Sequence, residues 1–156
     1  MIHQRNFYTE KIYKALNLLP IVVLIGARQV GKTTILQNLD LNGEKLFLNG
    51  QNPEINEIFQ KYSTLEAYLK INMNSDLNGF LLIDEFQYIH GISTMLKLLA
   101  DNCNNLKILC TGSSSLDILQ EEAFRQSLFV IWSGKDKSSS SNWINICRKR
   151  EIIDLY

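Results

Sequence analysis

The feature that most constrains the fold is a run of five apolar residues followed at once by a glycine-bounded loop. Ile21–Ile25 contains no polar residue, which favours a strand covered on both faces, as in a parallel sheet. The next eight residues, GARQVGKT from Gly26 to Thr33, have the composition and spacing of a phosphate-binding loop. Pro20 ends a helix predicted over residues 6–18. A buried strand that leads through such a loop into a helix predicts an α/β fold.

Strand and helix patterns alternate along the rest of the chain. Predicted strands cover residues 45–48, 80–83, 106–110 and 128–132, and predicted helices cover 33–39, a segment from Pro53, 64–72, 93–102 and 116–126. This alternation is typical of a mostly parallel sheet with helices on both faces. One domain is predicted over residues 1–132, and the polar residues that follow predict a flexible C-terminal tail over 133–156.

The glycine loop carries the first candidate site. Its backbone N–H groups are expected to point at phosphate oxygens, next to the positive end of the following helix. The Lys32 side chain is expected to reach the β- and γ-phosphates of ATP, and the Thr33 hydroxyl to bind Mg²⁺. The predicted nucleotide-binding residues are Gly26, Ala27, Arg28, Gln29, Val30, Gly31, Lys32, Thr33 and Thr34.

Two adjacent carboxylates follow the predicted strand 80–83. Such a strand delivers Asp84 to the carboxyl edge of the sheet, where ligands bind in open α/β folds, and Asp84 is expected to hold Mg²⁺ there. Glu85 is the candidate general base that activates a water molecule, so Glu85 and Lys32 are the predicted catalytic residues. A helix cap is the alternative for this acidic pair. Gln87, just past this pair, could also sense phosphate, but it is interpreted as an exposed residue at a helix start.

A hydroxyl-rich segment, TGSSS, follows the predicted strand 106–110. Thr111 or Ser113 is a candidate sensor of the γ-phosphate, and one sequence does not choose between them; a helix cap is the competing interpretation. Arg125 is the only arginine between this strand and residues 128–132. It is the candidate arginine finger, with an exposed helix residue as the alternative. A second copy of the chain is the other source of such an arginine, and would require a homo-oligomer.

Charge and cysteine content argue against several classes of protein. The chain has 16 basic and 16 acidic residues, so it lacks the basic excess typical of nucleic-acid binding. Cys103, Cys110 and Cys147 fit neither a paired metal motif nor a disulfide framework, which predicts free thiols. The N-terminus has no apolar signal-peptide core, and no apolar run approaches the ~20 residues that span a bilayer. These features predict a cytoplasmic protein without a membrane partner.

Three segments in order, GARQVGKTT, FLLIDEFQYI and LKILCTGSSSLDIL, resemble bacterial and archaeal AAA-type ATPases whose ATPase core precedes an uncharacterised C-terminal domain. The resemblance runs from Gln4 to Gln120 and includes LNGQNPEI at residues 48–55. It implies an AAA+-type P-loop core that binds Mg-ATP. The glycine loop then corresponds to the Walker A motif, Asp84 and Glu85 to Walker B, and TGSSS to the sensor position.

The sequence departs from this family in places. Ala27 stands where the family has proline, and His90-Gly91 replaces a proline-containing stretch. After Gln120 the family's Leu-Ala-Gly-Arg-like segment and its C-terminal domain are missing, so the chain is expected to be truncated or altered in frame there. Three hypotheses follow: an ATPase that hydrolyses the β–γ bond, a nucleotide-binding module with little turnover, and a remnant without a stable fold.

Overall fold

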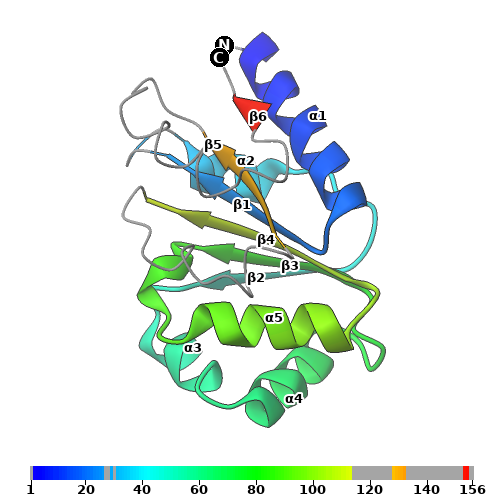
Figure 1. The fold of residues 1–156 in the computed structure, drawn as a ribbon, viewed down its shortest axis with the longest axis vertical. Helices are drawn as coiled ribbons and strands as arrows, with labels where there is room; N and C mark the ends of the chain where they lie inside the picture. Colours follow the sequence, from blue (N-terminus) through cyan, green and yellow to red (C-terminus); the bar gives the residue numbers. More distant parts are fainter. Residues whose placement is uncertain (1, 27–28, 30, 114–127, 133–152, 155–156) are drawn as a thin grey trace.

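The computed structural model describes residues 2–26, 29, 31–113, 128–132 and 153–154. Within them the helices are α1 (Ile2–Leu18), α2 (Lys32–Asn38), α3 (Pro53–Ile58), α4 (Tyr62–Asn72), the 3-10 turn η1 (Phe86–Tyr88) and α5 (Ile92–Asn102). The strands are β1 (Ile21–Ile25), β2 (Lys45–Asn49), β3 (Gly79–Asp84), β4 (Leu106–Gly112), β5 (Leu128–Trp132) and β6 (Ile153–Asp154). Figure 1 shows these elements coloured along the sequence.

The strands form one sheet in the order β2-β3-β4-β1-β5-β6, and every neighbouring pair is parallel. The α/β fold with a parallel sheet is therefore confirmed, as are the strands predicted within β1 to β5. β4 lies between β1 and β3 although it follows both in sequence. As a result, the loop after β1 and the acidic end of β3 lie on either side of the tip of β4.

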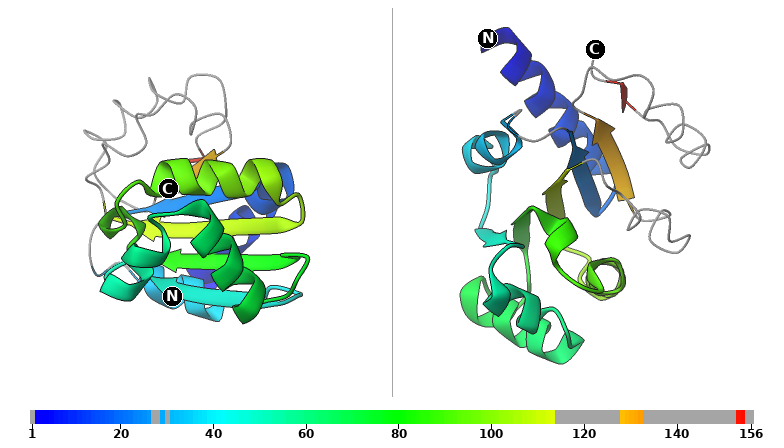
Figure 2. Two further views of the ribbon diagram at one scale, coloured as in Figure 1. Left: turned by 90° about the horizontal axis from the view of Figure 1, so that it is seen from below. Right: turned by 90° about the vertical axis from the view of Figure 1, so that its left-hand side faces the viewer.

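Helices cover both faces of this sheet, as the sequence predicted. Alternate residues of β1 point to opposite sides: Val22 and Leu24 share a core with α1 and α2, whereas Val23 and Ile25 share a core with α3, α4 and α5. Figures 1 and 2 show the same division, with α1 and α2 on one face and the other three helices on the opposite face. Because β1 is buried on both sides, its uniformly apolar sequence follows from its place in the middle of the sheet.

Local signals explain where several helices begin. The Asn52 side chain caps α3 by accepting a hydrogen bond from the Glu54 backbone N–H at 3.0 Å, and Pro53 occupies the first helical turn. α1 begins at Ile2, several residues before the predicted start at residue 6. No pattern predicted η1, which forms directly after the acidic pair.

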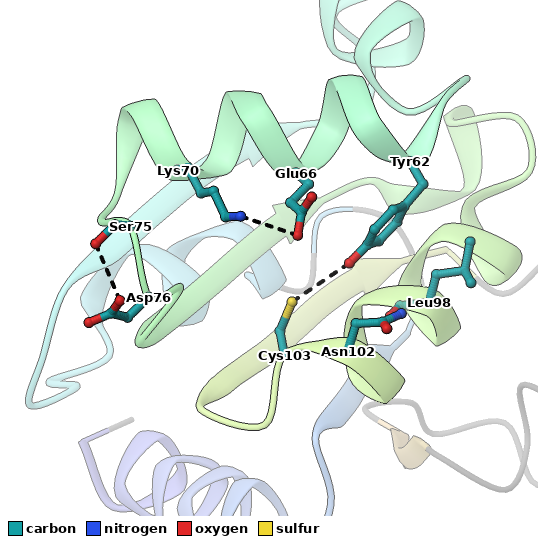
Figure 3. Close-up of polar contacts among 8 residues, drawn as sticks. All are labelled: Tyr62, Glu66, Lys70, Ser75, Asp76, Leu98, Asn102 and Cys103. Carbon is teal, nitrogen blue, oxygen red and sulfur yellow. Dashed lines mark hydrogen bonds and ion pairs between the residues drawn. The ribbon is translucent and has the colours of Figure 1, made fainter.

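Helix α4 packs against the end of α5 (Figure 3). The Tyr62 hydroxyl lies 3.9 Å from the Cys103 sulfur, and Lys70 pairs with Glu66 at 3.4 Å along the exposed side of α4. Cys103 and Cys110 are both buried free thiols, which confirms that prediction for these two residues. Burial raises the pKa of the Cys110 thiol. Cys147 lies outside the described residues.

Other predictions fall on residues whose structure is not described. The helix predicted over 116–126 is among them. Within the segment predicted as a C-terminal tail, Ile153–Asp154 pairs with β5, while residues 133–152 lie outside the described ranges. The domain boundary at residue 132 therefore stays a prediction. In the ranges that are described, no helix is long and apolar enough to cross a membrane.

Candidate active site

Three parallel strands end side by side at one edge of the sheet. Ile25 at the end of β1 is level with Gly112 of β4, and Ile83 of β3 is level with Cys110. The Gly26 backbone N–H donates to the Gly112 carbonyl at 3.3 Å. The glycine loop, the acidic pair and the tip of β4 are therefore brought together, although they are far apart in sequence.

The described part of the glycine loop is sharply bent. Gln29 has φ 63° and Gly31 has φ 88°, both in the left-handed region, and Gly31 caps the start of α2. A glycine adopts this conformation without steric cost, so Gly31 lets the chain turn directly from the loop into the helix. Ala27, Arg28 and Val30 lie outside the described residues, and Thr34 is exposed on α2.

Lys32 is the first residue of α2 and is only 5% exposed. Its Nζ donates a hydrogen bond to the Gly26 carbonyl at 2.9 Å, so the ammonium group points back into the loop. Burial lowers the pKa of Lys32, and the nearby carboxylates of Glu85 and Asp84 partly oppose this effect. A buried cation in this position favours an anionic ligand, because a phosphate group would offset the loss of hydration.

The next residue reaches the acidic pair. The Thr33 hydroxyl donates to Oδ2 of Asp84 at 2.7 Å, although the two residues are 51 positions apart. The hydroxyl of Thr111, at the tip of β4, donates to the other carboxylate oxygen, Oδ1. Asp84 is 6% exposed and Thr111 is fully buried. The Asp84 carboxylate is therefore fixed between the loop and β4.

Glu85 has an unusual backbone conformation, with φ 52° and ψ 47°. Non-glycine residues rarely adopt the left-handed region, and such outliers cluster at functional sites. Its backbone N–H donates to the Thr111 hydroxyl at 3.3 Å, and its side-chain Oε2 accepts from Nε2 of Gln87. The same Gln87 nitrogen donates to the Ser113 hydroxyl at 3.2 Å. Of the two sensor candidates, Thr111 thus makes direct hydrogen bonds with the acidic pair, whereas Ser113 is connected to it through Gln87.

The interpretation of Gln87 as an exposed helix-start residue is wrong. Gln87 is partly buried in the 3-10 turn η1, and its amide faces Glu85 and Ser113. The turn forms because the chain leaves β3 at Glu85 in the left-handed conformation. The pattern of apolar residues does not predict that conformation. The only sequence signal was the proximity of Gln87 to the acidic pair.

Gly50, just after β2, approaches the acidic pair from the other side and was not singled out from the sequence. Its N–H donates to the Asp84 carbonyl at 2.8 Å. A Cβ atom at Gly50 would lie 2.4 Å from the Glu85 carbonyl oxygen. Because that contact is with backbone, no side-chain rotation relieves it, and only glycine fits here. The glycine of the segment LNGQ was the available signal.

The oxygen atoms at this site suit Mg²⁺. The Thr33 hydroxyl and the Asp84 carboxylate are adjacent, and Mg²⁺ is bound by oxygen ligands, commonly one or two carboxylates completed by water and phosphate. In the part of the chain that the structure describes, no group of three or more His, Cys, Asp or Glu residues is placed to hold a metal ion. Such a group is not needed for this mode of binding. Arg125, the candidate arginine finger, lies outside the described residues.

Comparison with known proteins adds family information to this geometry. Residues 19–128, more than half of the chain, match the model of a family described as an AAA domain. Two uncharacterised proteins, of Mycobacterium bovis and Mycobacterium tuberculosis, are each 28% identical over 120 residues, which is 76% of this chain and 25% of theirs. The chain thus spans about a quarter of the length of these relatives.

Among solved structures, a Walker-type ATPase of Pyrococcus abyssi superposes with a TM-score of 0.53 and 17% sequence identity. The match covers 90% of this chain and 56% of that protein. At this identity the likeness concerns the fold alone. It agrees with the parallel sheet and two helical layers described above.

Proposed function

Because the chain belongs to the family of AAA domains, which bind nucleotides, we propose that it binds ATP together with Mg²⁺ and hydrolyses the β–γ phosphoanhydride bond. The observation that supports this proposal best is the hydrogen bond between Thr33 and Asp84. It joins the phosphate-binding loop to the acidic end of β3, the two parts that a magnesium–nucleotide complex must contact together.

Lys32 supplies the positive charge for the phosphates. Its ammonium group is buried inside the loop and makes a hydrogen bond to the Gly26 carbonyl. A phosphate oxygen is a better acceptor than a neutral carbonyl, since hydrogen bonds between charged groups are shorter and stronger. Bound β- and γ-phosphates would therefore replace the Gly26 carbonyl as the hydrogen-bond acceptor of the Lys32 ammonium group. The nucleotide-binding residues remain those predicted, from Gly26 to Thr34.

Thr33 and Asp84 are the residues that would hold Mg²⁺. Thr111 restrains the Asp84 carboxylate from the β4 side, so its second oxygen stays directed at Thr33. A bound Mg²⁺ neutralises charge on the phosphate oxygens. The protein's contribution is to hold these two ligands side by side before nucleotide binds.

Glu85 is the residue that we assign as the general base. Its carboxylate would accept a proton from water while the water oxygen forms a bond to the γ-phosphorus and the bond to the β-phosphate oxygen breaks. The products are ADP and inorganic phosphate. The left-handed backbone at Glu85 turns its side chain away from the line of β3, toward Gln87, so Asp84 and Glu85 serve different groups.

Titration calorimetry and phosphate release test the two halves of this proposal separately. Mg-ATP should bind in a saturable, one-to-one manner, and single-turnover assays should detect ADP formation. An arginine finger contributes ~10³–10⁵ in rate in related chemistry, so turnover is expected to be slow when neither Arg125 nor a second copy of the chain supplies one. Saturable binding without any product would support the alternative of a binding module; no binding would remove the proposal.

Asp84→Asn should make ATP binding insensitive to magnesium. The substitution keeps the shape of the side chain but removes the charge that attracts Mg²⁺. We expect the ratio of ATP affinities measured by calorimetry with Mg²⁺ and with EDTA to fall toward unity. Asp101→Asn on α5 is the matched control, because Asp101 is exposed and pairs with Lys97 along the same helix. An undiminished magnesium effect in Asp84→Asn would assign the metal to other ligands.

Gly50→Ala should impair hydrolysis more than binding. The added Cβ would displace the carbonyl group of Glu85, and misplacement of a catalytic group by about 1 Å can cost ~10²-fold in rate. We expect single-turnover hydrolysis to fall roughly tenfold or more, with the affinity for Mg-ATP nearly unchanged.

Gly91→Ala is the control for this substitution. A Cβ at Gly91 meets nothing within 4 Å, although its φ of +68° makes alanine strained there. The strain should cost about 1–2 kcal/mol of stability and leave hydrolysis intact. If both alanine variants reduced hydrolysis equally, general destabilisation would explain the result and the close approach of Gly50 would not matter.

A further inference from the structure

We propose that Gln87 is a positioning residue that holds the Glu85 carboxylate against the tip of β4, so that hydrolysis depends on Ser113 through Gln87. The inference rests on the proposed function, because it requires Glu85 to act as the base. It goes further by giving a role to Gln87, which belongs neither to the glycine loop nor to the acidic pair, and to one of the two sensor candidates.

The hydrogen bonds around Gln87 connect two elements. Nε2 of Gln87 donates both to Oε2 of Glu85 and to the hydroxyl of Ser113. An amide nitrogen has two hydrogens, so both are used and the amide is fixed in rotation. Glu85 follows β3, whereas Ser113 follows β4. The amide therefore makes a bridge between the candidate base and the next strand of the sheet.

The Gln87 amide packs against Gly112, where the absence of a side chain leaves space for it. A Cβ atom at Gly112 would lie 2.6 Å from the Phe86 ring and 2.9 Å from Oε1 of Gln87. Phe86 is fully buried beside it, so the ring cannot easily give way. Glycine at position 112 is thus what allows η1 to pack its Phe86 and Gln87 side chains against β4.

The carbonyl end of the same amide is not satisfied. Oε1 of Gln87 is buried without a hydrogen-bond partner among the residues that the structure describes. Burial of an unpaired acceptor is unfavourable. If this side chain only filled space, an apolar side chain of the same size would give a more stable protein. The two donated hydrogen bonds are the feature that an apolar residue could not replace, which points to the donor end as the functional one.

The bridge has a chemical consequence for Glu85. A carboxylate that accepts a proton from water must present an oxygen in a fixed direction, because the effect of a general base depends on its geometry. Gln87 holds Oε2, which leaves Oε1 for the water. Ser113 directly follows β4, so a displacement of Ser113 would move the Gln87 amide and with it the Glu85 carboxylate.

The test uses single-turnover hydrolysis and nucleotide binding with the full chain. Gln87→Leu removes both donors at similar volume, and should lower the hydrolysis rate roughly 10- to 100-fold while the affinity for Mg-ATP stays within about threefold. Ser113→Ala should lower the rate by a smaller factor. Gln60→Leu is the matched control, because the Gln60 side chain is exposed and its amide donates to Asn56 on α3 rather than to Glu85 or Ser113.

Two double variants separate positioning from a structural role. If Gln87 acts through the Glu85 carboxylate, adding Gln87→Leu to Glu85→Gln should not reduce the rate further, since residues that work as a unit are not additive. Adding Ser113→Ala to Gln87→Leu should also change nothing. Gln87→Asn and Gln87→Glu, which shorten the amide or replace it by an acceptor, should not restore the rate.

A second readout does not require turnover. The side-chain NH₂ signals of Gln87 in NMR spectra should move in Ser113→Ala and in Glu85→Ala, because each variant removes one acceptor. Unmoved signals, or full hydrolysis by Gln87→Leu, would overturn the inference. Additive losses in both double variants would overturn it too. If Glu85→Gln itself hydrolyses at the parental rate, the proposed base fails instead, and this outcome is distinct because Gln87 is intact.

Discussion

Replacing Lys32 by methionine should weaken Mg-ATP binding at least tenfold, which corresponds to about 1.4 kcal/mol. The side chain starts α2, is 5% exposed, and directs its ammonium group into the glycine loop. Methionine fills nearly the same space without a charge, so the change removes the charge-assisted hydrogen bonds to phosphate and little else. Titration calorimetry of the two proteins measures the difference directly.

The same substitution should not destabilise the protein at pH 7. Burial lowers the pKa of Lys32 below its ordinary value of 10.5, so the folded state holds the charged amine less well than the unfolded state does. This cost is present at pH 7 and disappears as the pH rises through the lowered pKa toward 10.5. Lys32→Met should therefore be at least as stable as the parent at pH 7, and its advantage in urea unfolding should shrink at alkaline pH.

Lys97→Met provides the control for net charge. Lys97 pairs with Asp101 at 3.1 Å on the exposed side of α5, where ion pairs contribute little to stability. Its affinity for Mg-ATP should equal that of the parent. Equal affinities in Lys32→Met and Lys97→Met would remove the loop from the nucleotide site.

Replacing Glu85 by glutamine should lower hydrolysis by about 10²-fold or more while Mg-ATP still binds. Glutamine keeps the shape of the side chain and can still accept the hydrogen bond from Gln87, but it cannot take a proton from water. The loss should appear in the single-turnover rate and not in the affinity, because Thr33 and Asp84 remain in place. Quenched-flow measurement of ADP formation at saturating nucleotide reports this rate.

Glu57→Gln is the matched control for the loss of a carboxylate, because Glu57 is exposed on α3. It should hydrolyse ATP at the parental rate. A Glu85→Gln protein as fast as Glu57→Gln would show that Glu85 is only the residue that leads into η1, and the base would have to be sought elsewhere.

The fold could be predicted because its signals are strong and local. Ile21–Ile25 is apolar throughout since β1 is buried on both faces, and Asn52-Pro53 specifies a helix start by capping chemistry that needs no tertiary contact. The order of the strands in the sheet could not be obtained this way. It depends on contacts between residues far apart, such as those that insert β4 between β1 and β3.

The candidate site shows the same difference between local signals, which could be predicted, and contacts between distant residues, which could not. Lys32, Thr33 and Asp84 were predicted from motifs, and the structure brings them together; their roles stay predictions. Gly50 was missed, and Gln87 was interpreted as an exposed residue, because the contacts of both with Glu85 follow from the folded backbone. Each depends on the left-handed turn at Glu85, and a glutamate gives no sequence signal for that conformation, which is more usual for glycine or asparagine.

At position 85, the residue that would make the left-handed turn most stable differs from the residue that the proposed hydrolysis requires. Glycine at this position would relieve the cost of a left-handed side-chain-bearing residue, about 1–2 kcal/mol, in part offset by the greater freedom of glycine in the unfolded chain. The most stable version of this turn thus lacks the carboxylate. A directed-evolution experiment that selects only for heat resistance should accumulate glycine or asparagine at position 85. Retention of glutamate over many generations requires that each round also select for turnover.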